Sequence, residues 1–480
     1  MSPTIAEIES LKARYTAAGQ DHLFTFYEDL TPEEQTTFLN QLDKLDIERV
    51  NQIFKKAVAT SRNSNNKNQN LEPLPDDVFD SVLDTNEDKI KEWEKLGFNM
   101  IAQNKVCAIL MAGGQGTRLG SSAPKGCYDI HLPSGKSLFQ LQAERILRLQ
   151  KVAQDIRKPK MKFATETFFK QHNYFGLKEE NVIFFEQGTL PALTYEGKVL
   201  METKSTLAVA PNGNGGMYVA LRKEKIFESM IARNISYVHV YCVDNCLVRV
   251  ADPIFIGYCI SKNVDCGTKV VRRIDPHESA GVIALRDGKF IAIGCSEIEP
   301  AVAEQRKPNG QLTYGAASIA NHFYTVDFLK HVESFENELE YHIANKKIKH
   351  IDINTGELIF PSKPNGMKLE LFVSGVFPFT KRMAVLEADR KDEFSPLKNG
   401  PNTACDNPET CRRDIINLYV RFVEKAGGTV IPGEGDSFDN LSFEISPLVS
   451  YSGEGLEKLK GKTIKAPFIF ETPADLDKFY

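Results

Sequence analysis

The sequence predicts an α/β fold in which a Rossmann-like mixed sheet is flanked by helices. From Val106 onward, short runs that are apolar on both faces alternate with segments of helical periodicity. This alternation is typical of buried strands joined by helices. The 480 residues are 42% hydrophobic and 26% charged, close to the average for globular proteins, which excludes a mostly disordered or fibrous chain. A chain of this length is expected to form two or three domains.

Residues 1–100 are predicted to form a helical N-terminal domain. Apolar side chains recur at helical spacing over residues 5–15 and again over residues 47–58. Between these stretches, Thr31 and Glu34 have the spacing of a capping box, with a proline in the first turn. These features indicate the start of a further helix.

Residues 101–395 are predicted to form the central α/β domain. A helix is expected over Ser137–Val152, because its apolar residues recur on one side. The expected strands are Val106–Ala112, Lys162–Thr165, Val182–Phe185, Leu207–Ala210 and Tyr237–Val243.

Residues 396–480 are predicted to form a small, β-rich C-terminal domain. Glycine and proline pairs punctuate short apolar segments there, a pattern that favours short strands over long helices. The expected segments are Ser442–Ile445, Leu448–Tyr451 and Ile464–Phe470.

Composition and charge exclude several classes of protein. Lys and Arg number 59 and Asp and Glu 64, a net charge of −5, so we expect no general nucleic-acid binding. No run approaches the roughly 20 apolar residues of a membrane helix, and the N-terminus lacks the pattern of a signal peptide. Nine cysteines are scattered without a Cys-x-x-Cys pair, which favours reduced thiols and a cytoplasmic location. No protein partner is predicted.

A glycine-rich loop after the first central strand predicts a polyphosphate site. The segment LMAGGQGTRLG (110–120) contains Gly113, Gly114 and Gly116, and glycines let backbone N–H groups approach an anion closely. Arg118 and Lys125 add positive charge. The segment is neither the dinucleotide fingerprint nor a Walker loop, because the third glycine of the former and the Gly-Lys-Ser/Thr of the latter are missing.

Three further segments are expected at the same edge of the sheet. Gln187, the Gly213-Asn214 pair and Asp244 each follow an apolar run, and ligands of open α/β sheets bind beyond the carboxyl ends of the strands. An aspartate at a strand end suits a magnesium ion held against phosphates. The alternative is that Asp244 caps the next helix.

The motifs resemble those of the eukaryotic UDP-N-acetylhexosamine pyrophosphorylases. The resemblance runs in order through almost the whole chain. It is carried by LMAGGQGTRLG with PKG (110–126), EQGTLPAL (186–193), APNGNGG (210–216), HVYCVDN (239–245), ADPIFIG (251–257), IANHF (319–323), KPNGMKLE (363–370), DEFSPLKN (392–399) and EISPLVSYSGEGLE (444–457). It implies a nucleotidyltransferase-type Rossmann-like mixed sheet. It also implies an activity: N-acetylglucosamine 1-phosphate attacks the α-phosphorus of UTP, giving the UDP-sugar and pyrophosphate.

The resemblance also implies roles for individual residues. Mg²⁺ or another divalent cation is the implied cofactor, held by Asp244. The implied catalytic residues are Arg118 at the leaving pyrophosphate, Lys125 at the α-phosphate, and Lys398. The implied nucleotide contacts are Gly113, Gly114, Gln115, Gly116, Gln187 and Gly213, and the implied sugar contacts are Asn214, Gly281 and Asn321. His239 and His322 are expected to have packing roles.

The chain departs from the family pattern in three places. Where the family commonly has Glu-Tyr-Ser-Glu, Phe-Val-Phe-Asp and Pro-Val-Gly-Val, this chain has Gly294-Cys295-Ser296-Glu297, Phe372-Val373-Ser374-Gly375 and Ser279-Ala280-Gly281-Val282. All three are expected on the sugar side, so UTP binding should be intact while the sugar contacts differ.

Three hypotheses follow. The chain is an active N-acetylhexosamine 1-phosphate uridylyltransferase, the same enzyme remodelled for another sugar 1-phosphate, or a weakly active paralogue that binds uridine nucleotide and has a regulatory role. The presence of Lys125, Asp244 and Lys398 argues against the third, because a protein that only binds nucleotide has little need of all three. The choice between gluco and galacto sugars is left open.

Overall fold

The chain folds into two compact units, each assembled from three stretches of sequence. The structure is a computed structural model that describes residues 4–62, 70–113, 117–121, 123–154, 166–295, 297–434, 437 and 440–479. The first unit comprises Met1–Gln69, Glu186–Glu224 and Val332–Val376. The second comprises Asn70–Phe185, Lys225–His331 and Phe377–Tyr480.

The second unit is built on a mixed sheet that joins nine of the described strands. Strand β3 (Val106–Met111) runs parallel to β8 (Tyr237–Cys242). Strand β12 (Ala316–Thr325) lies antiparallel between β8 and β9 (Cys266–Arg272). Strand β17 (Met383–Ala388) runs parallel to β9. The mixed sheet predicted from the sequence is confirmed.

Short strands extend this sheet at its edges. Strand β2 (Phe79–Ser81) runs parallel to β17. Strand β10 (Val282–Arg286) pairs antiparallel with the beginning of β12, with β11 (Lys289–Ile293) and with β1 (Leu71–Glu72). The further helices of the second unit are α6 (Glu166–Gln171), α8 (Ile226–Ala232), α10 (Pro300–Ala303), α11 (Val326–His331) and α12 (Arg390–Glu393).

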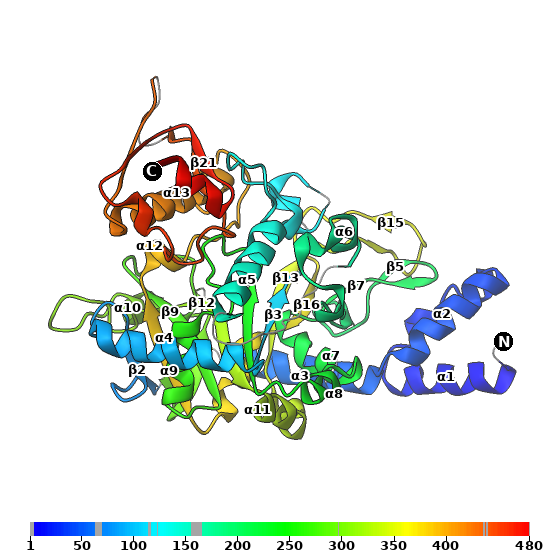
Figure 1. The fold of residues 1–480 in the computed structure, drawn as a ribbon. Helices are drawn as coiled ribbons and strands as arrows, with labels where there is room; N and C mark the ends of the chain where they lie inside the picture. The colour runs from blue at the N-terminus through cyan, green and yellow to red at the C-terminus, as the bar shows by residue number, and fades with distance from the viewer. Residues whose placement is uncertain are drawn as a thin grey trace. The chain divides into compact units, whose positions relative to one another are not determined.

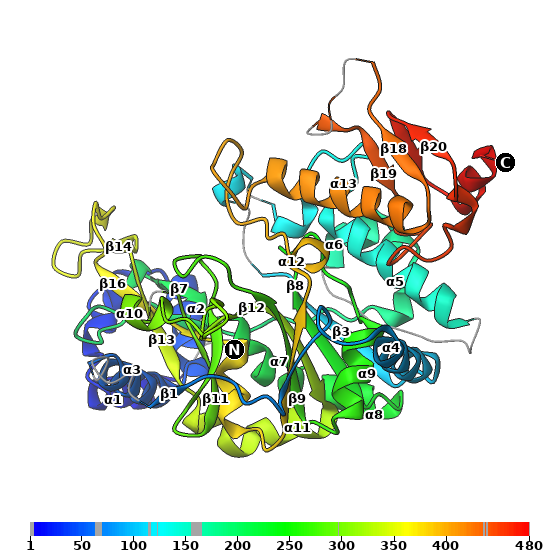
Figure 2. The ribbon, with the colours of Figure 1, turned by 90° about the vertical axis from the view of Figure 1, so that its left-hand side faces the viewer.

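Two helices of the second unit pack unusually closely. Helices α4 (Glu87–Ala102) and α9 (Pro253–Ser261) lie side by side in both ribbon views (Figure 1, Figure 2). A Cβ atom on Gly97 would lie 1.9 Å from the carbonyl oxygen of Pro253, and one on Gly257 would lie 1.8 Å from that of Trp93. The two glycines therefore permit backbone contact between the helices. Helix α5 (Leu138–Gln154) matches the helix predicted after the first central strand.

The C-terminal part of the second unit is less β-rich than predicted. Its largest element is α13 (Pro408–Lys425), which is 18 residues long and starts at a capping box of Asn407 and Thr410. Four strands of three residues accompany it: β18 (Thr429–Ile431), β19 (Phe443–Ile445), β20 (Thr463–Lys465) and β21 (Phe468–Phe470). Helix α13 was missed, although Ile415, Tyr419 and Phe422 recur on its buried side.

The first unit joins the N-terminal helices to short β-ladders. Helices α1 (Ile5–Ala17), α2 (Pro32–Lys44) and α3 (Ile47–Arg62) are as predicted, and the Thr31–Glu34 capping box is confirmed. The remaining elements are α7 (Met217–Lys223) and the antiparallel pairs β4 (Thr189–Pro191) with β7 (Val209–Pro211), β5 (Met201–Thr203) with β6 (Thr206–Leu207), β13 (Tyr341–Lys346) with β16 (Gly366–Leu371), and β14 (His350–Ile351) with β15 (Leu358–Ile359).

The domain division expected from the sequence, 1–100, 101–395 and 396–480, does not coincide with these units. The N-terminal helices share a core with Leu193, Met201 and Met367. The C-terminal helix shares a core with residues of the 119–141 stretch. Segments distant in sequence complete each core, and sequence periodicity alone does not report such pairing.

Two expected central strands also differ. The Leu207–Ala210 run contributes to small ladders of the first unit instead of to the central sheet. Val182–Phe185 is not among the strands that the structure describes, and the expected strand over residues 162–165 lies outside the described residues.

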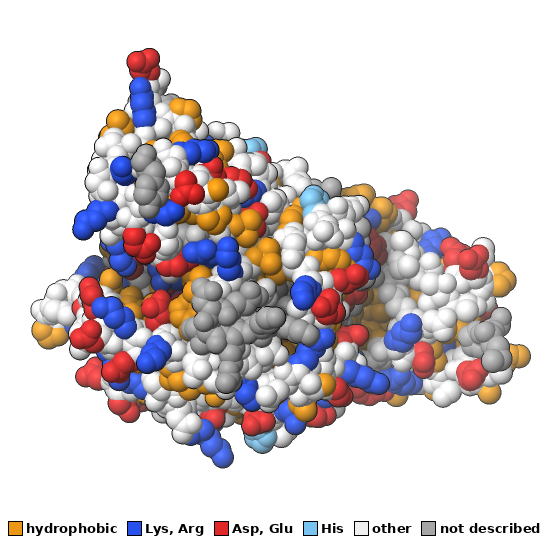
Figure 3. Space-filling view, viewed as in Figure 1, with side chains coloured by type: hydrophobic (Ala, Val, Ile, Leu, Met, Phe, Trp, Pro, Cys, Tyr) orange, Lys and Arg blue, Asp and Glu red, His pale blue; other side chains and the backbone are white. Residues whose placement is uncertain are grey.

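On the face shown in Figure 3, acidic and basic side chains are interspersed. No helix in the described part of the chain has the length and apolar character needed to cross a membrane.

Candidate active site

Two segments of the second unit, distant in the chain, are joined backbone to backbone. The N–H of Cys246 donates to the carbonyl oxygen of Ser395 at 2.9 Å, and the N–H of Leu397 donates to that of Asp244 at 2.8 Å. An antiparallel bridge between Asn245 and Pro396 lies between these bonds. The pairing brings Asp244, just beyond β8, beside Lys398, the residue after Leu397. The sequence prediction assigned both residues to the site without indicating this link.

Side chains reinforce this junction. The Asn245 amide donates to the carbonyl oxygen of Glu393 at 2.7 Å, and its oxygen accepts from the N–H of Ser395 at 3.1 Å. The Glu393 carboxylate in turn contacts the fully buried ammonium of Lys269, which also pairs with Asp252 at 2.5 Å. A buried, hydrogen-bonded ion network of this kind holds its members in one arrangement, because leaving a charge unpaired in the interior is costly. The chain that leads to Lys398 is therefore held in place at Glu393.

Lys125 lies close enough to Asp244 to affect its charge. Burial raises the pKa of the Asp244 carboxyl, and the positive charges of Lys125 and then Lys398 oppose that rise. Lys125 begins a short 3₁₀ turn, Lys125–Cys127. A Cβ atom on the next residue, Gly126, would lie 2.2 Å from the ring of Phe139. The glycine thus lets this turn pack directly against α5.

Arg118 belongs to the same unit and lies near the end of the Lys398 segment. It is exposed and lies in the 3₁₀ turn Thr117–Leu119. A Cβ atom on Gly400 would lie 2.5 Å from the carbonyl oxygen of Arg118, so the backbones touch two residues beyond Lys398. Gly113 is exposed two residues after β3. Gly114, Gln115 and Gly116 lie outside the described residues.

The first unit holds two residues of the proposed nucleotide contacts and one of the proposed sugar contacts. The Gln187 amide donates to the carbonyl oxygen of Gly213 at 3.2 Å. Gly213 has φ of +87°, and a Cβ atom there would lie 2.3 Å from the carbonyl oxygen of Leu371, so this position requires glycine. The Asn214 side-chain oxygen accepts from the N–H of Val373 at 2.8 Å. The Gly/Asn loop is therefore fixed to the end of β16, an association that the sequence did not indicate.

Asn321 lies in the second unit, on β12, with its side chain oriented by His239. The N–H of Ala251 donates to His239 Nδ1 at 3.0 Å, so the proton of the neutral ring is on Nε2, which contacts the Asn321 oxygen. This leaves the Asn321 Nδ2 atom buried and without a hydrogen-bond partner among the described residues. Asn321 is only 1% exposed, so it is less open than a sugar-lining residue was expected to be. His239 and His322 are buried in the sheet, as their expected packing roles require.

The structure locates the three departures from the family pattern. Gly281 accepts from the N–H of Ser318 at 2.8 Å, and it lies directly before β10. A Cβ atom on Gly294 would make only ordinary contacts, at 3.5 Å from Glu297, and Cys295 is exposed. A Cβ atom on Gly375 would likewise lie 3.5 Å from Leu371. Positions 294 and 375 therefore have room for a Cβ atom. Ser296 lies outside the described residues.

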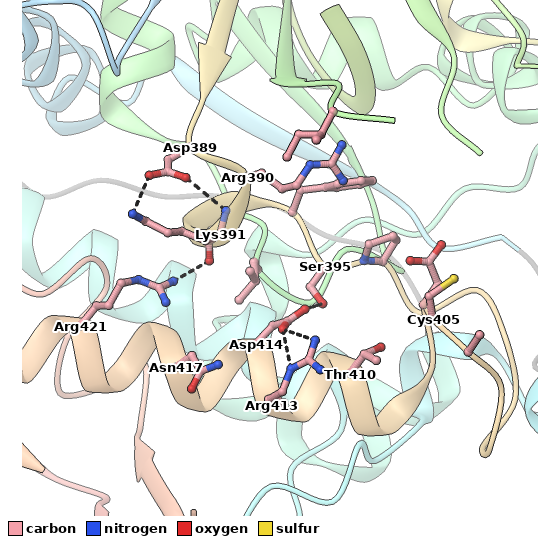
Figure 4. Close-up of a pocket in the computed structure, with 16 residues that line it drawn as sticks. Asp389, Arg390, Lys391, Ser395, Cys405, Thr410, Arg413, Asp414, Asn417 and Arg421 are labelled. Atoms are coloured by element: carbon pink, nitrogen blue, oxygen red, sulfur yellow. Dashed lines mark hydrogen bonds and ion pairs between the residues drawn. The ribbon is translucent and has the colours of Figure 1, made fainter. Parts of the chain in front are cut away.

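A cavity of about 560 Å³ lies against the segment that leads to Lys398. Figure 4 shows its lining, most of which comes from α12, the Phe394–Pro396 stretch, Ala404–Asp406 and the part of α13 between Thr410 and Arg421. Ser395 donates to Asp414 at 2.8 Å, and Arg413 pairs with the same carboxylate at 3.0 Å. No residue of this lining is among the site residues predicted from the sequence, although Phe394, Ser395 and Pro396 belong to the DEFSPLKN string.

The described residues contain no group of three or more His, Cys, Asp or Glu side chains that could hold a metal ion by itself. Asp244 contacts the Lys398 segment through the backbone ladder described above, and the Asp406 carbonyl oxygen accepts from the N–H of Lys398 at 2.8 Å. A single carboxylate is sufficient for Mg²⁺ when substrate phosphates complete the coordination. The Asp244 carboxylate therefore fits a metal that arrives with a nucleotide.

Comparisons with known proteins agree with the motifs. Residues 47–412 match the family model of UTP--glucose-1-phosphate uridylyltransferase. UDP-N-acetylhexosamine pyrophosphorylase-like protein 1 of Xenopus tropicalis is 43% identical over 98% of each chain. The UDP-N-acetylglucosamine pyrophosphorylase of Saccharomyces cerevisiae is 42% identical over 94% of this chain and 97% of its own.

A solved structure shows the same fold. The uridine diphosphate N-acetylglucosamine pyrophosphorylase from Trypanosoma brucei, in complex with inhibitor, superposes with a TM-score of 0.80 at 27% identity, covering 96% of this chain and 98% of that one. With relatives above 40% identity along nearly its whole length, the chain belongs to the UTP--glucose-1-phosphate uridylyltransferase family and, within it, to the UDP-N-acetylhexosamine pyrophosphorylases.

Proposed function

We propose that this protein is a uridylyltransferase that forms UDP-N-acetylglucosamine and pyrophosphate from UTP and N-acetylglucosamine 1-phosphate. The observation that carries the proposal is the backbone ladder that brings Asp244 beside Lys398, with Lys125 within electrostatic reach. Two lysine cations beside the Asp244 carboxylate suit a reaction between two polyanions. Family membership supplies the substrate class.

In the proposed reaction, a phosphate oxygen of the sugar 1-phosphate forms a bond to the α-phosphorus of UTP. The bond from that phosphorus to the oxygen bridging the β-phosphate breaks, and pyrophosphate leaves. Such a transfer needs in-line positioning and charge neutralisation instead of a covalent nucleophile. Lys125 and Lys398 stabilise the charge on the α-phosphoryl oxygens, and Arg118 stabilises the leaving pyrophosphate.

Asp244 would hold Mg²⁺ or another divalent cation together with phosphate oxygens of UTP. When bound, the ion neutralises the triphosphate and so lowers the cost of bringing a second anion near it. The raised pKa of the Asp244 carboxyl fits this role. Nearby lysines only partly offset the cost of burying its charge, so a bound cation would stabilise the carboxylate. The proposed nucleotide contacts are Gly113, Gly114, Gln115, Gly116, Gln187 and Gly213, and the proposed sugar contacts are Asn214, Gly281 and Asn321.

A second candidate function is the same chemistry on a different sugar 1-phosphate. Gly294 and Gly375, where the family commonly has larger residues, favour it, since a Cβ atom at either position would make only ordinary contacts. We also propose a cytoplasmic location, which all nine cysteines as free thiols support.

Pyrophosphate release from UTP tests the proposal, with N-acetylglucosamine, N-acetylgalactosamine and glucose 1-phosphates as acceptors. Release that is fastest with an N-acetylhexosamine 1-phosphate supports the proposed function. Faster release with glucose 1-phosphate would support the second candidate. UTP binding without release with any acceptor would indicate a nucleotide-binding paralogue.

A further inference from the structure

The Lys398 side chain is held by a segment that none of the site assignments includes. Its ammonium donates to the carbonyl oxygen of Ser279 at 3.3 Å. Ser279 lies in the stretch Asp275–Ala280, between β9 and β10. The ammonium is also 3.9 Å from the Asp406 carboxylate. The carbonyl contact depends on where the backbone of this stretch lies, and not on the side chain at position 279.

Two arginines from different elements fix the 275–280 stretch. Arg390, the first residue of α12, donates from one nitrogen to both carboxylate oxygens of Glu278 at 2.8 Å. Arg273 follows β9 and is only 3% exposed. It donates to the carbonyl oxygens of Pro276 and, at 3.3 Å, Glu278. Arg390 thus holds the stretch through the Glu278 side chain, and Arg273 holds it through two backbone carbonyl oxygens.

The ring of Phe394 lies near both Arg390 and Lys398. The Arg390 guanidinium carbon is 5.5 Å from its centroid, and the Lys398 ammonium is 5.9 Å from it. Both distances are within the range of a cation–π contact. Arg390 and Phe394 line the cavity shown in Figure 4. Arg390 therefore affects Lys398 by two routes: through the Glu278 stretch and through the Phe394 ring.

We propose that Glu278 and Arg390 are positioning residues for Lys398: their ion pair holds the Ser279 carbonyl oxygen, which sets the place of the lysine ammonium. The inference rests on the proposed function, because it assumes that Lys398 acts at the phosphates. It also accounts for one departure from the family pattern. A proline at 279 would present the same carbonyl oxygen, so replacing it with serine leaves the contact intact.

The physical reason lies in the flexibility of lysine. Its long side chain has several rotatable bonds and a point charge, so it needs external contacts to be held in one place. A displacement of about 1 Å at a reacting centre costs on the order of 100-fold in rate. The Glu278 and Arg390 side chains are 19% and 33% exposed, so losing the pair should cost less free energy of unfolding than losing a fully buried pair. Loss of this pair should therefore reduce turnover without unfolding the protein.

The experiment compares Glu278→Gln and Arg390→Gln with a matched control. Both variants should lower kcat about 10- to 100-fold, with the KM for UTP and the midpoint of urea unfolding close to wild type. The control is Arg382→Gln, which breaks the Arg382–Asp265 pair of 2.9 Å at the opposite end of β9. It should leave kcat unchanged. The reciprocal double variant Glu278→Arg/Arg390→Glu, which restores a pair, should recover part of the lost rate.

A double-mutant cycle with Lys398→Met separates positioning from a general structural role. If Glu278 acts through Lys398, adding Glu278→Gln to Lys398→Met should cause little further loss, because coupled residues are not additive. Full additivity would overturn the inference, as would wild-type kcat in Glu278→Gln. Wild-type kcat in Lys398→Met itself would instead refute the assignment of Lys398 under the proposed function.

Discussion

The N–H of Leu397 donates a hydrogen bond to the carbonyl oxygen of Asp244 at 2.8 Å. Through this bond, the chain beyond β8 and the chain beyond α12 become neighbours, and the residue after Leu397 is the lysine assigned to the phosphates. An acid and a cation assigned to one reaction are therefore tied by the backbone, which is more rigid than any side-chain contact between them.

Substitution of Lys125 should reduce turnover more than nucleotide affinity. In Lys125→Met we expect kcat to fall about 100- to 1,000-fold, because the lysine charge is most effective against the charge that develops in the transition state. Steady-state kinetics with varied UTP checks this. Lys151→Met, an exposed lysine on α5, is the control and should behave as wild type. A raised KM for UTP with normal kcat would mean that Lys125 binds ground and transition states equally.

Activity should require a divalent cation, and the required concentration of the cation should increase as the pH falls. Burial raises the pKa of Asp244, so protons compete for this carboxylate at a pH where an ordinary aspartate is ionised. The Mg²⁺ concentration for half-maximal rate should therefore rise as pH falls. Chelation should abolish activity, and added Mg²⁺ should restore it.

The Asp244→Asn variant should lose most activity at limiting Mg²⁺ and should lose the acid sensitivity of its metal requirement. The control is Asp265→Asn. Asp265 lies directly before β9, and its carboxylate pairs with Arg382. Full activity of Asp244→Asn at limiting Mg²⁺ would remove this residue from the metal site.

Restoring the family residues at 294 and 295 should improve use of the sugar substrate. The double variant Gly294→Glu/Cys295→Tyr should lower the KM for N-acetylglucosamine 1-phosphate, or raise kcat/KM, by about one to two powers of ten. That range corresponds to the ~1–3 kcal/mol cost of an unpaired polar group. A Cβ atom at position 294 would make only ordinary contacts, at 3.5 Å from Glu297. An unchanged KM for UTP is part of the prediction; if the UTP KM moves instead, these residues are not on the sugar side.

Stability should fall below about pH 6.5 through His239. Burial lowers the pKa of this ring from 6.5 to about 4, so the unfolded chain takes up a proton first as the pH falls. The contribution of the neutral His239 ring to the free energy of unfolding is complete above pH 6.5 and is lost between pH 6.5 and 4. It amounts to at most about 3 kcal/mol. Urea unfolding at pH 7 and pH 4.5 measures it. His239→Gln, which keeps a donor toward Asn321, should show a smaller difference between the two pH values.

Elements with strong local signals were predictable from the sequence. The Thr31–Glu34 capping box, β3, β8 and α5 are all where periodicity and caps placed them. Helix α13 carried the same kinds of signal, a cap at Asn407 and an apolar stripe, so it could have been predicted.

Pairings between distant segments were not predictable in this way. The Leu207–Ala210 run is equally apolar whether it pairs with β4 or with a central strand, so the sequence offers no basis for choosing. Likewise, nothing local to Glu278 or Arg390 indicates that they meet. The candidate catalytic residues were found by motif, whereas the contacts that hold them arise only from the tertiary fold.

The interleaving of the two units has a consequence for biosynthesis. The N-terminal helices complete their core only with residues such as Met367 and Leu369, which are translated long after residue 69. At the usual rate of ~5–20 residues per second, that interval is roughly 15 to 60 s. During it, Phe38, Leu42 and Val50, all buried in the finished protein, lack part of their apolar partners. A ribosome that stalls between the two stretches would leave exposed the surface that chaperones recognise.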